Sequence, residues 1–110
     1  MSQIEDELKQ ILQQSIGTVT SQVVGLVNNA KNDSNQILKD QGAKMEKYIH
    51  QLAAGEITKE DFEENVRDLA RLVKMEAAKM SAEAKVRADK ISQGVETAVI
   101  NGVCKLIHLA

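Results

Sequence analysis

The chain is poor in the residues that interrupt helices and in those that fill large globular cores. Its 110 residues include no proline, no tryptophan, one tyrosine and one phenylalanine. The absence of proline removes the commonest helix breaker. Because aromatic side chains normally supply much of a core, this one must be built from Val, Ile, Leu, Met and Ala. Side chains of that size suit packing between helices, so we expect an all-α protein.

The chain also has a single cysteine and no excess of positive charge. The single cysteine, Cys104, excludes an internal disulfide and is typical of a reducing compartment. The net charge of −2 argues against nucleic acid as a partner, because phosphate binding needs a basic excess. The first residues are acidic between Glu5 and Glu7, where a secretory signal would be basic and then apolar. We therefore expect a cytoplasmic protein that binds no nucleic acid.

At the centre of the chain, the end of one helix is followed at once by the start of another. Gly55 can take the left-handed conformation that closes a helix. Thr58 can cap the next helix, and Ile57 can pack on Phe62 as a hydrophobic staple across that cap. We predict one helical domain over residues 1–110, with a first arm at about 3–54, a turn at 55–57 and a second arm at about 58–108.

Apolar residues recur every three or four positions in both arms, which is the period of an α-helix. Two such arms joined by a tight turn predict a long antiparallel helical hairpin. The weakest stretch is Asn28 to Asn35, with the sequence NNAKNDSN, because asparagine and aspartate favour caps over helix interiors. A break there would turn the hairpin into a three- or four-helix bundle, and the sequence leaves both forms open.

Charge disappears towards the end of the hairpin that lies opposite the turn. No residue from Gln10 to Ala30 is charged, and the last twenty positions hold only Glu96 and Lys105 as charged side chains. The apolar surface there is too wide for one neighbouring helix, and uncovered apolar patches mark interaction sites. We predict that two copies join there into a four-helix bundle. The predicted interface residues are Ile16, Val19, Val23, Val27, Val95, Val99, Val103 and Leu106.

Small residues are spaced four apart in the same two stretches, so each set lines one face of its helix. This spacing lets another backbone approach closely and is familiar from membrane helix pairs. The predicted close-packing positions are Gly17, Ser21 and Gly25 in the first arm, and Gly94, Ala98 and Gly102 in the second.

No catalytic or cofactor motif is present in the sequence, which lacks a glycine-rich phosphate loop, a GxSxG turn and a Glu-x-x-His pair. His50 lies four residues after Glu46, but one histidine with one carboxylate is a poor metal site. We therefore expect a non-enzymatic interaction or scaffold module that forms a homodimer or homotetramer through its uncharged open end. Two alternatives stay open: an amphipathic hairpin that binds lipid or another hydrophobic surface reversibly, and a subunit that completes a bundle with a different helical protein.

Overall fold

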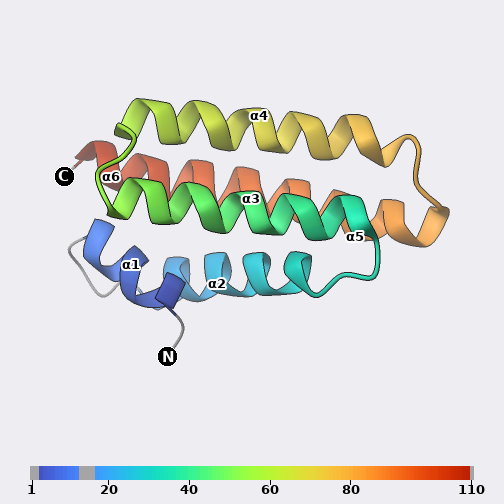
Figure 1. The fold of residues 1–110 in the computed structure, drawn as a ribbon, viewed down its shortest axis with the longest axis horizontal. Coiled ribbons are helices and arrows are strands. Elements are labelled where there is room, and N and C mark those ends of the chain that lie inside the picture. The colour runs from blue at the N-terminus through green and yellow to red at the C-terminus, as the bar shows by residue number, and fades with distance from the viewer. Residues whose placement is uncertain (1–2, 13–16, 110) are drawn as a thin grey trace.

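The computed structural model describes residues 3–12 and 17–109, and every regular element in these ranges is a helix (Figure 1). The prediction of an all-α protein is confirmed. In chain order the elements are α1 (Gln3–Leu12), α2 (Gly17–Lys31), α3 (Gln36–Ala53), α4 (Lys59–Ala77), α5 (Ala82–Gly94), the π-helix η1 (Val95–Cys104) and α6 (Lys105–Leu109).

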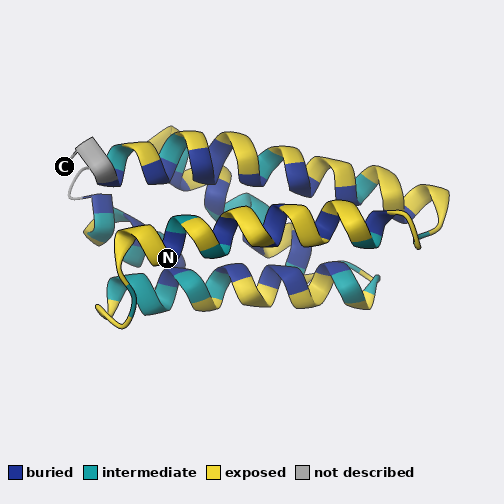
Figure 2. Cartoon of the chain, turned by 90° about the horizontal axis from the view of Figure 1, so that it is seen from above, coloured by how far each residue is buried: buried dark blue, intermediate teal, exposed yellow. Residues whose placement is uncertain are grey.

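The helices form four columns, each antiparallel to the one before it in the chain. The columns are α2, α3, α4 and a continuous run of α5, η1 and α6 (Figure 1). α3 and η1 each contact both α2 and α4, so α2 and α4 lie at opposite edges of the molecule. α1 packs across one end, against α2 and α3. The whole measures 40 × 27 × 21 Å, and buried positions line the inner side of each column (Figure 2).

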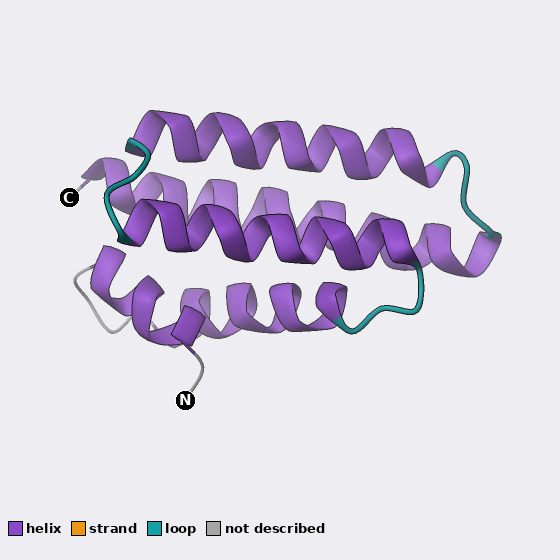
Figure 3. Cartoon of the chain, viewed as in Figure 1, coloured by secondary structure: helices purple, strands orange, loops and turns teal. Residues whose placement is uncertain are grey.

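Neither predicted arm is one continuous helix, and this corrects the long hairpin. The first arm is divided at residues 32–35, inside the asparagine-rich stretch where a break was left open (Figure 3). Asn35 caps α3: its side-chain oxygen accepts hydrogen bonds from the backbone N–H groups of Ile37 at 3.0 Å and Leu38 at 3.2 Å. The physical reason for the break is therefore the preference of asparagine for a cap over a helix interior.

The second arm is divided at residues 78–81, where we expected a continuous helix. Ser81 caps α5, because its hydroxyl oxygen accepts a hydrogen bond from the backbone N–H of Ala84 at 3.3 Å. Glu83 follows in the first turn of α5, as suits a helix start. A serine with an acidic residue behind it was the signal for this break, and the regular apolar spacing across it concealed that signal.

At the central turn, Gly55 has φ +75°, which is the left-handed region that glycine adopts most readily. The backbone N–H of Asp61 donates to Thr58 Oγ1 at 3.0 Å, and that of Thr58 donates back to Asp61 Oδ2 at 3.3 Å. These two bonds form a capping box at the start of α4. Phe62 is buried, and Ile57 packs at the edge of the same core. The turn thus sets α3 and α4 side by side.

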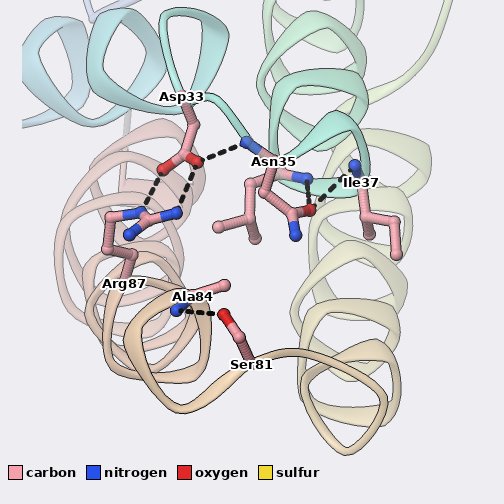
Figure 4. A network of polar contacts seen from close by, with 7 residues as sticks. Asp33, Asn35, Ile37, Ser81, Ala84 and Arg87 are labelled. Carbon is pink, nitrogen blue, oxygen red and sulfur yellow. Dashed lines mark hydrogen bonds and ion pairs between the residues drawn. The ribbon is translucent and has the colours of Figure 1, made fainter.

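An ion pair fixes the first break to α5. Arg87 donates from Nε to Asp33 Oδ2 at 2.9 Å and from Nη2 to Asp33 Oδ1 at 3.2 Å (Figure 4). The backbone N–H of Asn35 donates to the same carboxylate at 2.8 Å. Burial by itself would raise the pKa of Asp33, but the hydrogen bonds from Arg87 and Asn35 outweigh it, so this pKa is lowered. The carboxylate therefore stays ionised although its side chain is only 6% exposed.

Asp33 should make the stability of the fold depend on pH in the acidic range. Because its pKa is lower in the folded than in the unfolded chain, its contribution is complete above pH ~4 and is lost as the pH falls through the lowered value. We expect Asp33→Asn to lower the urea midpoint at pH 7 and to flatten the loss of stability below pH ~4. Urea unfolding followed by circular dichroism at several pH values measures both effects. Asp89→Asn, at an exposed carboxylate on α5, is the matched control, and identical profiles for the two variants would contradict the assignment.

Two glycines in neighbouring helices have opposite surroundings. A Cβ built on Gly42 of α3 would lie 2.7 Å from Ala30 Cβ and 2.7 Å from the backbone nitrogen of Lys31, so α2 and α3 approach closely there. A Cβ on Gly25 of α2 would have nothing within 4 Å. One glycine is therefore needed for packing, whereas the other only costs its helix conformational entropy.

These surroundings predict opposite effects of the same substitution. Gly42→Ala should destabilise the fold by about 1–3 kcal/mol, because the backbone of α2 must move away. Gly25→Ala should stabilise it by about 0.5–1 kcal/mol, since alanine is the better helix former. Chemical unfolding of the two variants beside the wild type decides the sign of each effect. A loss of stability in Gly25→Ala would show that the outer side of α2 is not open.

Candidate functional site

Five of the six valines predicted to join two copies lie inside the core of one chain. Their exposure is at most 1% of the side chain, and the set consists of Val23, Val27, Val95, Val99 and Val103. Val19 and Leu106 are half-buried at the edge of the same core, and Ile16 lies outside the described residues. The expectation that a lone chain leaves this surface uncovered rested on two unbroken arms. Once each arm folds back, α2 is covered by α3 on one side and by η1 on the other.

The small residues of the C-terminal column receive side chains from α2. A Cβ on Gly94 would lie 2.8 Å from Leu26 Cδ1, and a Cβ on Gly102 would lie 3.1 Å from Val19 Cγ1. Ala98, between the two glycines, is 5% exposed. This set therefore serves close packing within the chain.

The small residues of α2 lie on its outer side. Gly17 and Ser21 are exposed and Gly25 is half-buried. A Cβ on either glycine would meet nothing within 4 Å. The two sets look alike in sequence, but only the glycines on α2 have no side chain packed against them.

A groove of about 450 Å³ runs between α2 and the junction of α5 with η1, and we call it the α2 groove. Four predicted close-packing positions line it, and Lys90 is its one charged lining residue. Its other polar lining side chains are amides and hydroxyls, which both donate and accept hydrogen bonds. The lining residues are Ser21, Gln22, Gly25, Leu26, Asn29, Lys90, Gln93, Gly94, Thr97 and Ala98.

One wall of the α2 groove includes part of a π-helix. Thr97 and Ala98 belong to η1, which continues α5 without a gap and spans Val95–Cys104. π-helical turns are rare and are frequent at functional sites. The buried valines of η1 hold this segment against α4 and α2, so the wall is a firmly packed surface.

His50 and Glu46, four residues apart in α3, each pair with a different partner within the chain. His50 Nδ1 pairs with Glu7 of α1, and Glu46 pairs instead with Lys31 at 2.8 Å. Within residues 3–12 and 17–107, no group of three or more His, Cys, Asp and Glu could hold a metal ion. Apart from Glu7 Oε1, which pairs with His50, the buried side-chain oxygens without a hydrogen-bond partner in this part of the chain are those of Thr20, Gln41 and Ser92. The α2 groove is therefore the surface where predicted close-packing positions border open space.

Comparison with protein families, with curated proteins and with solved structures found no match to this chain. None of the helices in the described ranges is long and apolar enough to cross a membrane.

Cys104 is 1% exposed and lies on the inner side of η1. Burial, together with the nearby Glu63 carboxylate, raises the pKa of this thiol to about 11. The reactive form of cysteine is the thiolate, so a protonated and buried thiol should be inert.

We expect Cys104 in the folded chain to react with a disulfide reagent at pH 8 at least ~10-fold more slowly than in urea. The absorbance of the released thiolate measures both rates. An Ala43→Cys, Cys104→Ala chain, whose only thiol is exposed on α3, should react equally fast with and without urea. Equal rates for wild-type Cys104 in the two conditions would contradict its burial.

Proposed function

We propose that this protein is a non-enzymatic helical interaction module that self-associates through the α2 groove. The observation that carries the proposal is the groove itself, whose α2 side combines small residues with an absence of charge. Small residues let a second helix approach closely. An uncharged surface spares the partner the cost of removing ions from water.

A second copy of α2 fits this surface chemically. The outer side of the second α2 carries the same amides and hydroxyls. Gln22 and Asn29 of one copy can therefore hydrogen-bond with the amides of the other copy. A contact between identical surfaces about a two-fold axis is the commonest form of protein dimer. Wet, hydrogen-bonded contacts of this kind are ordinary at protein interfaces.

A different helical protein could occupy the same groove, and this alternative differs only in the partner. Lipid binding has less support, because the apolar side chains on which it rested lie in the core. The amides of the groove would lose water on contact with acyl chains and gain no hydrogen bond in return.

The mass of the protein in solution tests the proposal. We expect light scattering across a dilution series to give a mass above that of one chain. Gly25→Arg should lower this mass, since the new side chain is long and charged and would occupy the groove. Ala43→Arg, at an exposed position in the middle of α3, is the matched control and should leave the mass unchanged. A wild-type protein that is monomeric at every concentration would refute self-association and direct the search to a different helical partner.

A cysteine on the α2 face identifies the surface involved. Ser21→Cys places one exposed thiol on α2, while Cys104 remains buried. We expect mild oxidation to link two Ser21→Cys chains much faster than two chains carrying Ala43→Cys. Equal rates of linkage would show that contact between copies does not involve the α2 face.

A further inference from the structure

One stripe along the outer side of α4 carries acidic residues first and basic residues after them, with the exposed Asp68 beside its basic half. Glu60 and Glu64 are exposed in its first half. Arg67, Arg71 and Lys74 follow in its second half and are also exposed. Each pair of equal sign is spaced four residues apart, at 60 and 64 and at 67 and 71, so its members lie about 6 Å apart along one helix face.

The cationic half of α4 lines a groove. This groove, of about 320 Å³, lies between α4 and the π-helix η1, which contributes Glu96 and Asn101. Its floor is apolar, with Ala70 5% exposed and Ile100 8% exposed. Three cations and one carboxylate line it, in a chain whose net charge is −2. Lys74 pairs with Glu96 in this groove at 2.7 Å, so Arg67 and Arg71 are the two cations whose carboxylate partners lie outside the lining.

The pairs that the two arginines make within the chain leave them able to bind more. Arg67 lies 3.7 Å from Glu63, and Arg71 Nη1 lies 3.1 Å from Asp68. Both arginines are well exposed, with 49% and 71% of the side chain accessible, so these pairs contribute little to stability. A guanidinium also has five N–H donors, and one carboxylate does not use them all.

The acidic half of α4 is the complementary partner. Glu60 and Glu64 make no ion pair with any of the described residues, and both face solvent. We propose that two copies of this chain pair along α4 in antiparallel orientation. The register that sets Glu60 of one copy opposite Arg71 of the second copy also sets Glu64 opposite Arg67. Two-fold symmetry then repeats both contacts.

The order of charges argues for a second copy over a polyanion. A phosphate backbone would be attracted by Arg67 and Arg71 but repelled by Glu60 and Glu64 on the same helix. A partner must present the two signs in reverse order and at the same spacing, and an antiparallel α4 does so. This surface is separate from the α2 groove, because α2 and α4 lie at opposite edges of the molecule (Figure 1).

Exchange of charges between two variants tests this pairing. All chains carry Gly25→Arg, so the α2 groove does not contribute. Sedimentation velocity should show association of this parent at about 50 mM salt and about tenfold weaker association at about 500 mM. Adding Glu60→Arg or Arg71→Glu should abolish association of either chain alone. An equimolar mixture of the two should restore it as a 1:1 complex, because each contact again joins opposite charges.

Lys47→Glu, at an exposed lysine of α3, is the matched control and should associate like the parent. Circular dichroism confirms that each variant is folded. A mixture that stays monomeric, or a parent whose association does not depend on salt, would overturn the proposal. Growth of the mixture beyond a dimer would overturn the two-fold arrangement, since head-to-tail contacts do not close.

Discussion

The ion pair between Asp33 and Arg87 holds the point at which the first arm turns back on itself. Asp33 lies in the break between α2 and α3, and Arg87 lies fifty-four residues later on α5. Their contact joins the turn between the first two columns to the last column. The antiparallel arrangement of α2 beside α3 and η1 depends on that turn. The burial of the valines of α2 and η1 depends on the same turn, because a single neighbouring helix could not cover the apolar face of either.

Burial of those valines determines which surfaces remain for a partner. The wide apolar face of α2 needs more than one neighbour, and α3 and η1 supply two from the same chain. What remains outside on α2 in the groove is uncharged, with small residues beside the amides of Gln22 and Asn29 and with Gly25 facing open space. On α4, at the opposite edge, the outside is charged and carries a stripe of acidic and then basic side chains. The two surfaces therefore differ in chemistry, one suited to close helix contact and the other to electrostatic pairing.

The helical class of the protein could be predicted from its sequence, because local propensities and apolar spacing act over single turns. The conformation of Gly55 and the capping role of Thr58 depend on equally local chemistry. The break at 78–81 is different, since apolar spacing continues across it and one serine cap decides the outcome. The surroundings of the glycines could not be predicted at all. Gly25 and Gly94 have the same spacing pattern, and only the rotation of each helix about its axis separates a free surface from a packed one.

A long hairpin and the observed fold would bury the same apolar residues, so burial alone does not choose between them. Unbroken arms would need a second chain to cover Val23 and Val103, whereas broken arms use segments of the same chain. The second route has the advantage of effective concentration, because the covering helix is already tethered. Its cost is the loss of helical hydrogen bonds at two breaks. Asn35 and Ser81 offset that cost by capping the helices that begin there, and Asp33 adds a contact that a straight arm could not make.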